Sequence, residues 1–168
     1  MSPTNRLIIE PLVGHHDRRA FFCGEAALDH YIKRQATQGI KRRIARVFVA
    51  VSETAPTRIL GFYTLSALSI AAVDLSPGMA RKPPRHPLPA ALIGRLAVDA
   101  SAQGTGVGTM LVMDALHRAI AVSGEIAVFA AVVDAKDAHA RRFYEGSGFM
   151  PFPDTPLRLF LPLASVRE

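Results

Sequence analysis

The stretch LAVDASAQGTGVGTML, from Leu96 to Leu111, places the strongest constraint on how this chain can fold. It begins with strand-forming residues, continues through Gly104, Gly106 and Gly108, and ends in an apolar pattern at helical spacing. A strand that passes through a glycine turn into a helix leaves backbone N–H groups pointing outward at the positive end of the helix dipole. Phosphate is the usual ligand of such a turn, because glycines let it approach the backbone.

The residues after the last glycine narrow the kind of phosphate compound. A P-loop has a lysine followed by Ser or Thr at this point, whereas Thr109 and Met110 stand here, so ATP is not expected. The dinucleotide fingerprint has glycine where Thr109 stands and an acidic residue at the end of the next strand. Asp134 lies near that distance, and the turn alone leaves this alternative open.

The pattern along the chain predicts a mixed α/β sheet. Strand-forming segments are expected over residues 7–12, 46–52, 58–68, 92–98, 126–133 and 157–163. Helices are expected over residues 25–38, ending at Gly39, from Val107 to Ser123-Gly124, and over residues 137–147 with Gly148 at the C-cap. Prolines and Gly78 between Ser76 and Pro89 predict a surface loop. A hairpin in the first half and crossover helices in the second argue against a purely parallel, doubly wound fold.

Length and composition predict one cytoplasmic domain over residues 1–168. Apolar residues make up 49% of the chain and charged residues 20%, which argues against disorder. Cys23 is the only cysteine, so an internal disulfide is impossible and a reducing compartment is expected. No apolar run is long enough to cross a bilayer.

Two signatures resemble those of the GNAT N-acetyltransferases. The spacing Gln103-x-x-Gly106-x-Gly108 matches the loop with which this family binds the pyrophosphate of acetyl-CoA. The segment AHARRFYEGSGF, residues 138–149, resembles the family's second signature, A-x-x-F-Y-E-x-x-G-F. The resemblance implies the GNAT acyltransferase fold, an α/β fold with a mixed, mostly antiparallel sheet flanked by helices, and acetyl-CoA as the acetyl donor.

Four longer segments are similar to the TacT/AtaT-type toxins of bacterial toxin–antitoxin modules. They are FFCGEAALDHYIKRQATQ, GFYTLSALSI, LIGRLAVD and AVVDAKDAHARRFYEGSGF. This resemblance implies acetylation of the α-amine of aminoacyl-tRNA, which blocks translation. It also implies a ribbon-helix-helix antitoxin as partner, operator DNA bound through that complex, and a homodimer.

The resemblance assigns the cofactor site by position. The pantetheine arm maps to the strand residues Leu96, Ala97 and Val98, where a backbone N–H is the expected oxyanion donor. The pyrophosphate maps to the loop residues Gln103, Gly104, Thr105, Gly106, Val107, Gly108 and Thr109.

Tyr144 is the expected general acid, because it matches the family's catalytic tyrosine and a phenol can protonate the departing thiolate in a concerted step. Asp137 stands where many members have Asn, and it either alters a cofactor contact or serves the helix N-terminus. No side chain presents itself as general base. An α-amine, with a pKa of about 8, needs a base less than a lysine amine does, so an α-amine acceptor is favoured.

The basic residues predict an acidic partner. Lys and Arg number 20 against 14 Asp and Glu, for a net charge of +6, and they are clustered. The residues expected to hold tRNA phosphates are Lys33, Arg34, Lys41, Arg42, Arg43, Arg81, Lys82, Arg85 and Arg95.

No metal site is expected. His15 and His16 are adjacent in sequence and are interpreted as surface histidines, because no further ligands stand at zinc spacing. Cys23 is interpreted as a buried small apolar residue. Two alternatives stay open: acetylation of a protein N-terminus or small amine without a toxin role, and a module that chiefly binds DNA and an antitoxin.

Overall fold

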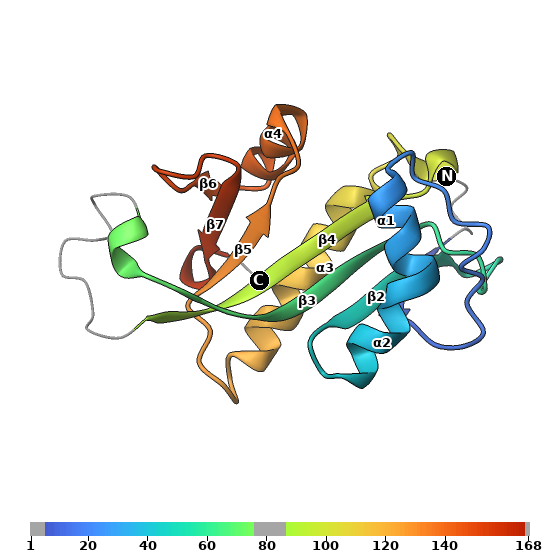
Figure 1. The fold of residues 1–168 in the computed structure, drawn as a ribbon, viewed down its shortest axis with the longest axis horizontal. Helices are drawn as coiled ribbons and strands as arrows, with labels where there is room; N and C mark the ends of the chain where they lie inside the picture. Colours follow the sequence, from blue (N-terminus) through green and yellow to red (C-terminus); the bar gives the residue numbers. More distant parts are fainter. Residues whose placement is uncertain (1–5, 76–86, 167–168) are drawn as a thin grey trace. The chain divides into compact units, whose positions relative to one another are not determined.

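The structure is a computed structural model that describes residues 6–75 and 87–166 (Figure 1). The strands are β1 (Leu7–Pro11), β2 (Arg46–Ser52), β3 (Gly61–Ile70), β4 (Leu88–Val98), β5 (Ala130–Asp134), β6 (Met150–Pro151) and β7 (Arg158–Pro162). The α-helices are α1 (Ala26–His30), α2 (Ala36–Lys41), α3 (Val107–Val122) and α4 (Ala138–Gly146). A π-helical segment, η1 (Tyr31–Gln35), joins α1 to α2, and the 3-10 turns are η2 (Ala72–Asp74), η3 (Ala100–Ala102) and η4 (Leu163–Ser165).

The sheet has the order β1-β2-β3-β4-β5-β7-β6. The pairs β1–β2, β2–β3, β5–β7 and β6–β7 are antiparallel, and β4–β5 is parallel. The parallel pair is connected through α3, as a crossover requires. The predicted mixed, mostly antiparallel sheet with flanking helices is confirmed.

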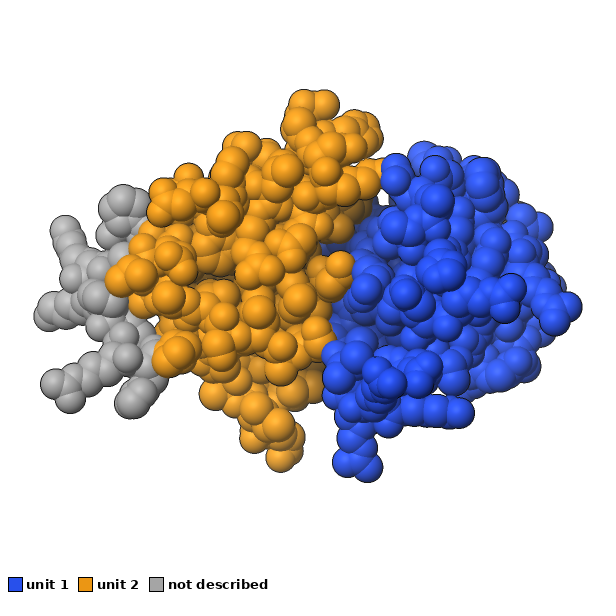
Figure 2. Space-filling view, in the orientation of Figure 1, with its two compact units in different colours: residues 1–65, 95–114 blue, residues 66–94, 115–168 orange. Residues whose placement is uncertain are grey.

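The chain divides into two compact units (Figure 2). Unit 1 comprises residues 1–65 and 95–114, and unit 2 comprises residues 66–94 and 115–168. The core of unit 1 contains Leu12, Phe21, Tyr31, Ile32, Ala36, Val47, Val49, Val51, Ile59, Phe62 and Ala97. The core of unit 2 contains Ile70, Leu75, Ala90, Val132, Phe152 and Phe160.

The first helical region is longer than predicted and contains a wide turn. The expected stop at Gly39 is wrong, because the helix continues through this buried glycine to Lys41. It ends where Arg43 adopts a left-handed φ of 60° and the Ile44 N–H donates to the Gly39 carbonyl at 3.1 Å. The π-helical turn also changes which side chain faces inward: Gln35 is exposed and Ala36 is fully buried.

Several strand boundaries differ from those expected. β3 begins at Gly61 instead of residue 58, and β5 begins at Ala130 instead of residue 126. β4 begins at Leu88, so Pro89 lies in a strand instead of a loop; its carbonyl accepts from the Phe129 N–H at 2.8 Å. A proline is tolerated at this place because a strand's first residues can lack a ladder donor. The two-residue β6 was not predicted.

No helix within residues 6–75 and 87–166 has both the length and the apolar character that membrane crossing requires.

Candidate functional site

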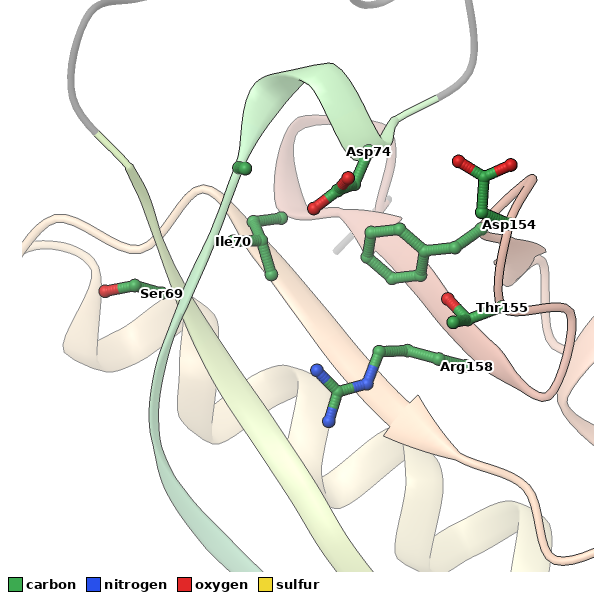
Figure 3. A pocket seen from close by; sticks show the side chains of 8 residues that line it. Ser69, Ile70, Asp74, Asp154, Thr155 and Arg158 are labelled. Carbon is green, nitrogen blue, oxygen red and sulfur yellow. The ribbon is translucent and has the colours of Figure 1, made fainter.

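Unit 2 contains a cavity of about 300 Å³ at the end of β3 (Figure 3). Its described lining is Ser69, Ile70, Ala71, Asp74, Phe152, Asp154, Thr155 and Arg158. Ile70 and Phe152 are buried, whereas the carboxylates of Asp74 and Asp154 are exposed. The Arg158 guanidinium is bound by Asp134 through two hydrogen bonds of 2.7 and 2.9 Å. This lining is therefore poorly suited to a phosphate, and none of the predicted site residues belongs to it.

The ion pair with Arg158 also bears on the dinucleotide alternative. That alternative needs a free carboxylate at the end of the strand after the glycine turn. Both carboxylate oxygens of Asp134 accept from Arg158, so the side chain is already committed within the protein. The structure thus disfavours a dinucleotide site.

The predicted pantetheine strand lies in unit 1, at the C-terminal end of β4. β4 pairs with β5 only from Ala90 to Ile93, and in the described structure its β5-side edge is unpaired beyond that point. Ala97 is buried in the core of unit 1, which fixes the strand, while Leu96 and Val98 are half-buried. An unpaired strand edge offers N–H and C=O groups to a ligand that pairs like another strand, as a pantetheine arm does.

Gly61, at the start of β3, allows the close packing behind this strand. A Cβ on Gly61 would lie 2.9 Å from the Ala97 carbonyl oxygen and 2.9 Å from Leu111 Cδ1. No ordinary Cβ contact is that short, so any side chain here would displace β4 or α3. Sequence reasoning missed this residue, because nothing local marks a glycine at a strand start as a packing requirement.

The glycine loop follows the strand and has the backbone that an anion site needs. Gly104 and Gly106 have φ values of +78° and +93°, which favour glycine over other residues. A Cβ built on either would meet no atom within 4 Å, so this side of the loop is open in the described structure. The glycines therefore serve backbone conformation and ligand approach.

The start of α3 supplies the donors. The first helical hydrogen bond runs from the Met110 N–H to the Gly106 carbonyl at 3.1 Å. The N–H groups that precede it have no acceptor within the helix; they belong to Val107, Gly108 and Thr109. These donors and the helix dipole fit the pyrophosphate of acetyl-CoA.

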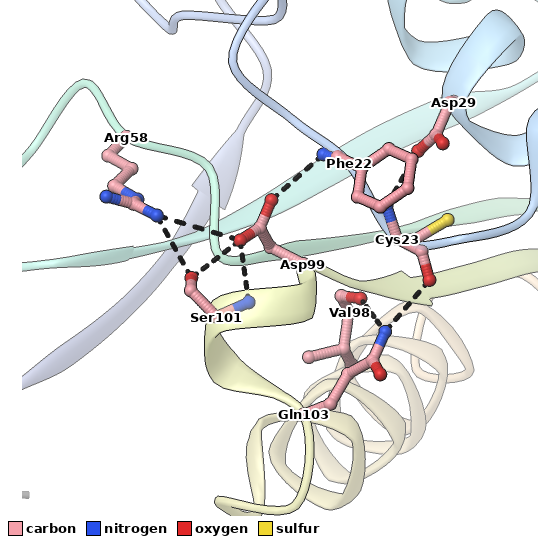
Figure 4. Close-up of polar contacts among 8 residues, drawn as sticks. All are labelled: Phe22, Cys23, Asp29, Arg58, Val98, Asp99, Ser101 and Gln103. Carbon is pink, nitrogen blue, oxygen red and sulfur yellow. Dashed lines mark hydrogen bonds and ion pairs between the residues drawn. The ribbon is translucent and has the colours of Figure 1, made fainter.

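Gln103 contributes to this loop in a way that the sequence did not reveal. Its Nε2 donates to the Val98 carbonyl at 3.0 Å and to the Cys23 carbonyl at 2.9 Å (Figure 4). The side-chain amide nitrogen thus ties the loop to the end of β4 and to the segment before α1. Its role in the structure is to position the loop.

Asp99 is the second residue that holds the loop, and sequence reasoning missed it. Its Oδ2 accepts from the N–H and hydroxyl of Ser101 at 3.0 and 2.6 Å, and its Oδ1 accepts from the Phe22 N–H at 2.9 Å (Figure 4). Burial by itself would raise the pKa of this carboxyl, but the hydrogen bonds and the charge of Arg58, 3.7 Å away, outweigh burial and lower the pKa. Asp99 is therefore held as a carboxylate.

Tyr144, the predicted general acid, lies on α4 in unit 2. Its ring is 7% exposed and lies edge-on to Phe143 and Phe149, with centroids 5.2 and 5.9 Å away. Burial, and secondarily the negative charge of Asp134, raises the pKa of Tyr144 to about 12. The phenol therefore stays protonated at neutral pH, which is the state that a general acid requires.

Asp137 serves the N-terminus of α4, which was one of its two expected roles. Its Oδ1 accepts from the Ala140 N–H at 2.8 Å. This hydrogen bond is the main reason that the pKa of Asp137 is lowered.

The predicted tRNA-binding residues within unit 1 are exposed. Five of them lie on the η1–α2 segment or just after it, and none of the five forms an ion pair with a described residue. They are Lys33, Arg34, Lys41, Arg42 and Arg43. Arg95 is also exposed, and its guanidinium lies over the ring of Tyr31. Arg81, Lys82 and Arg85 lie outside the described residues.

The two adjacent histidines are not both on the surface. His16 is 4% exposed, and together with His15 and Glu10 it brings ligand atoms within 4.8 Å of one another. His16 Nδ1 accepts from the Val13 N–H at 3.0 Å, so its Nε2 carries the proton and donates to Glu10 Oε1 at 2.8 Å. A metal bound at His16 Nε2 would require this nitrogen to lose its proton while Nδ1 still accepts from the Val13 N–H. The three residues are therefore better explained as a hydrogen-bonded cluster within the protein than as a metal site.

Cys23 packs against the core of unit 1 but is half-buried, so its interpretation as a buried apolar residue holds only in part. Burial raises the pKa of its thiol to about 11, so the thiol stays protonated at neutral pH.

Residues 45–149 match the model of the Acetyltransferase (GNAT) family. Two curated relatives match nearly the whole chain. A protein of Sinorhizobium fredii (strain NBRC 101917 / NGR234) named probable toxin TacT is 36% identical over 96% of this chain and 93% of its own length. A protein of Mycobacterium tuberculosis (strain ATCC 25618 / H37Rv) named tRNA-acetylating toxin is 35% identical over 90% of this chain and 89% of its own length.

Solved structures agree with these relatives. AtaT complexed with acetyl-methionyl-tRNAfMet is similar with a TM-score of 0.88 and 30% identity, over 95% of this chain and 96% of that one. A tyrosine-to-phenylalanine variant of the AtaT toxin, bound to the C-terminus of the antitoxin AtaR and to acetyl-CoA, is similar with a TM-score of 0.80 and 27% identity, over 95% of each chain. With its unpaired β4 edge, its glycine loop and the family match over both, the chain belongs to the GNAT acetyltransferase family.

Proposed function

We propose that this protein transfers the acetyl group of acetyl-CoA to the α-amine of aminoacyl-tRNA. The observation that carries the proposal is the cofactor half of the site. In the described residues, an unpaired edge of β4 leads into a glycine loop and a helix whose first N–H groups have no acceptor within the helix. Unit 1 also presents an exposed basic segment without ion pairs to described residues, which suits a polyanionic acceptor. The relatives named for tRNA acetylation support the same acceptor.

Acetyl-CoA, when bound, supplies the acetyl group as a thioester. The proposed pantetheine residues are Leu96, Ala97 and Val98, and a backbone N–H of this strand stabilises the oxyanion that forms when the amine nitrogen attacks. The proposed pyrophosphate residues are Gln103, Gly104, Thr105, Gly106, Val107, Gly108 and Thr109.

Tyr144 is proposed to donate its phenolic proton to the sulfur as the carbon–sulfur bond breaks. The proton that the amine loses reaches solvent and in turn restores the phenol, so the reaction needs no further reactant. Because the pKa of Tyr144 is about 12, the transfer of its proton to the thiolate must be concerted with the breaking of the carbon–sulfur bond. An acceptor α-amine, partly neutral at pH 7 to 8, allows the reaction to proceed without a strong general base.

The basic residues are proposed to hold the phosphates of the tRNA acceptor end. They are Lys33, Arg34, Lys41, Arg42, Arg43 and Arg95 in unit 1, with Arg81, Lys82 and Arg85 outside the described residues. We further propose that the whole chain acts as one catalytic domain, as a translation-blocking toxin in the cytoplasm. A homodimer, a ribbon-helix-helix antitoxin and operator DNA bound through the antitoxin complete this proposal.

The decisive experiment incubates the purified protein with acetyl-CoA and total aminoacylated tRNA, digests the RNA with nuclease, and searches by mass spectrometry for N-acetyl-aminoacyl-adenosine. We expect such a product for one or a few amino acids. Tyr144→Phe should lower kcat by about 100-fold or more and leave acetyl-CoA binding unchanged, because general acid catalysis contributes about that much. Acetylated peptide N-termini or small amines without any acetylated aminoacyl-adenosine would replace the tRNA acceptor by one of the alternatives.

A further inference from the structure

Arg95 and Tyr31 form a pair whose geometry points to a defined use. The Arg95 guanidinium carbon lies 4.0 Å from the centre of the Tyr31 ring, which is close enough for a cation–π interaction. Tyr31 is 4% exposed and Arg95 is exposed, so a buried ring supports a charge that faces solvent. The backbone N–H of Arg95 also donates to Thr64 Oγ1 at 3.0 Å, which fixes the start of its side chain.

The position of the Tyr31 ring depends on packing and not on its hydroxyl group. The ring stacks on Phe62 at a centroid distance of 6.0 Å and an interplanar angle of 25°. Its Oη is buried without a hydrogen-bond partner in the described structure, next to Gly39. A buried hydroxyl without a partner costs stability, so the hydroxyl does not explain the tyrosine. The part of Tyr31 that contacts Arg95 is the face of its ring.

The Arg95 guanidinium lies over the Tyr31 ring. No hydrogen bond or ion pair from the side chains of residues 6–75 or 87–166 engages the guanidinium N–H groups. A planar guanidinium presents several N–H donors along its edge, in the geometry that phosphate oxygens accept. A guanidinium held over a ring has also lost part of its rotamer freedom before any ligand binds, which lowers the cost of binding.

The place of Arg95 on β4 selects the source of the phosphate. Arg95 directly precedes the proposed pantetheine residues, while the proposed pyrophosphate loop begins beyond the other end of that segment, at Gln103. At about 3.3 Å per strand residue, Arg95 lies roughly 10 Å along the strand from Val98, and the loop lies farther still. Arg95 is thus at the acetyl end of the cofactor, where the acceptor must arrive.

We propose that the Tyr31 ring holds the Arg95 guanidinium as a clamp for one backbone phosphate at the acceptor end of tRNA. Arg95 is then a binding residue and Tyr31 a positioning residue that acts through it. This inference rests on the proposed function for the identity of the acceptor, and it adds the residue pair that places the acceptor.

Four variants of the full chain test the clamp: Arg95→Met, Arg95→Lys, Tyr31→Leu and Tyr31→Phe. The first readout is KM and kcat for aminoacyl-tRNA at several salt concentrations, with KM for acetyl-CoA measured alongside. Arg95→Met should raise KM for aminoacyl-tRNA about tenfold, as expected for a charge-assisted hydrogen bond. It should also lower the slope of log KM against log salt by about 0.7 to 1, which is the signature of one lost phosphate contact.

The other variants separate positioning from folding. Arg95→Lys should keep the slope of log KM against log salt, because the charge remains. It should still raise KM for aminoacyl-tRNA, because an ammonium group lacks the planar N–H donors of a guanidinium. Tyr31→Leu should raise KM about two- to fivefold, the size of an exposed cation–π interaction, and Tyr31→Phe should match the wild type. In an Arg95→Met background Tyr31→Leu should have no further effect on KM, whereas a merely structural Tyr31 would still affect it.

Binding of uncharged tRNA, followed by fluorescence anisotropy, keeps this inference separate from the proposed function. If the wild type acetylates no aminoacyl-tRNA, the proposed function fails, and the four variants are still compared by tRNA affinity and salt slope. Unchanged tRNA affinity and slope in Arg95→Met would overturn the clamp while leaving acetylation intact. A rise in KM for acetyl-CoA alone would assign the bound phosphate to the cofactor, and would equally overturn it.

Discussion

Asp99 accepts the backbone N–H of Phe22 at 2.9 Å, although the two residues are 77 positions apart in the sequence. The next residue along, Ala100, donates its N–H to the Phe22 carbonyl at 2.7 Å. Both backbone polar groups of Phe22 are therefore bound to the segment that leads into the glycine loop. The side chain of Phe22 is 60% exposed, so the contact is a backbone connection and not a burial of the aromatic ring.

Replacing Asp99 should destabilise the protein and loosen the loop. Asp99→Ala removes the acceptor of three hydrogen bonds and should lower the free energy of unfolding by about 2 to 3 kcal/mol, with weaker acetyl-CoA binding. Asp99→Asn keeps one acceptor oxygen and should lose less. Urea denaturation and calorimetric acetyl-CoA binding measure the two effects, and equal affinities in all three proteins would contradict the role in the loop.

The lowered pKa of Asp99 gives the same variants a pH signature. A carboxylate whose pKa is lowered in the folded state stabilises the fold above its unfolded pKa, and that contribution is lost as the pH falls through the folded pKa. From about pH 5 downward, the wild type should therefore lose its advantage over Asp99→Asn. A constant difference between them in acid would show that the carboxylate is not stabilised in this way.

The raised pKa of Tyr144 predicts the opposite trend in alkali. An unfolded tyrosine releases its proton near pH 10, whereas Tyr144 holds its proton to about pH 12. The stability that comes from the neutral phenol is complete below pH 10 and is lost as the pH rises through 12. The loss in the free energy of unfolding is about 1 kcal/mol by pH 11. Urea denaturation at pH 9 and at about pH 11 should show this loss in the wild type relative to Tyr144→Phe.

The packing of Gly61 against β4, the proposed pantetheine strand, can be tested with a matched glycine. Gly61→Ala places a Cβ 2.9 Å from the Ala97 carbonyl and should cost about 1 to 3 kcal/mol, because backbone must move. Gly146→Ala, at the end of α4 with no atom within 4 Å of its Cβ, should be neutral or stabilising by up to about 1 kcal/mol. Thermal denaturation compares the two, and only Gly61→Ala should weaken acetyl-CoA binding. If the two variants were equally stable, the start of β3 would be able to shift away from Ala97 without a loss of stability.

Arg43 combines a charge with a left-handed backbone, and two substitutions separate them. Its φ of 60° favours glycine, so Arg43→Gly should raise the free energy of unfolding by about 0.5 to 1 kcal/mol and Arg43→Ala should not. Both remove the same charge, and they should raise KM for aminoacyl-tRNA equally. If Arg43→Gly were more stable and still bound tRNA like the wild type, Arg43 would be a helix-ending residue only.

The parts of the molecule that the sequence predicted are those encoded by local chemistry. The strand–glycine–helix succession at residues 96–111 is a local backbone pattern, and the structure confirms it with positive φ values at Gly104 and Gly106. Residues recognisable in the sequence mark both ends of α4: Asp137 at its N-terminus and Gly148 after its C-terminus. Caps of this kind act over three or four residues, so one short segment is enough to specify them.

The parts that could not be predicted depend on partners far along the chain. The role of Asp99 depends on Phe22, and the need for Gly61 depends on Ala97 and α3. His16 was also expected on the surface, but it is buried and hydrogen-bonds to the Glu10 side chain and the Val13 N–H. These partners are near in sequence, so that prediction failed although the contacts are local. Whether the predicted tRNA residues contact RNA is decided by a partner molecule, and those assignments stay predictions.

The wide turn η1 at Tyr31–Gln35 sets the phase between the two halves of the first helical region. An α-helix advances about 100° per residue, so a turn that accommodates an extra residue offsets everything after it by that angle. Deleting one residue there would remove both that residue's rotation and the offset of the wide turn, and the two cancel, so Ala36 would stay in the core and Lys41 at the surface. Adding a residue would instead rotate both by about 100°. The segment should therefore tolerate the loss of one residue better than a gain.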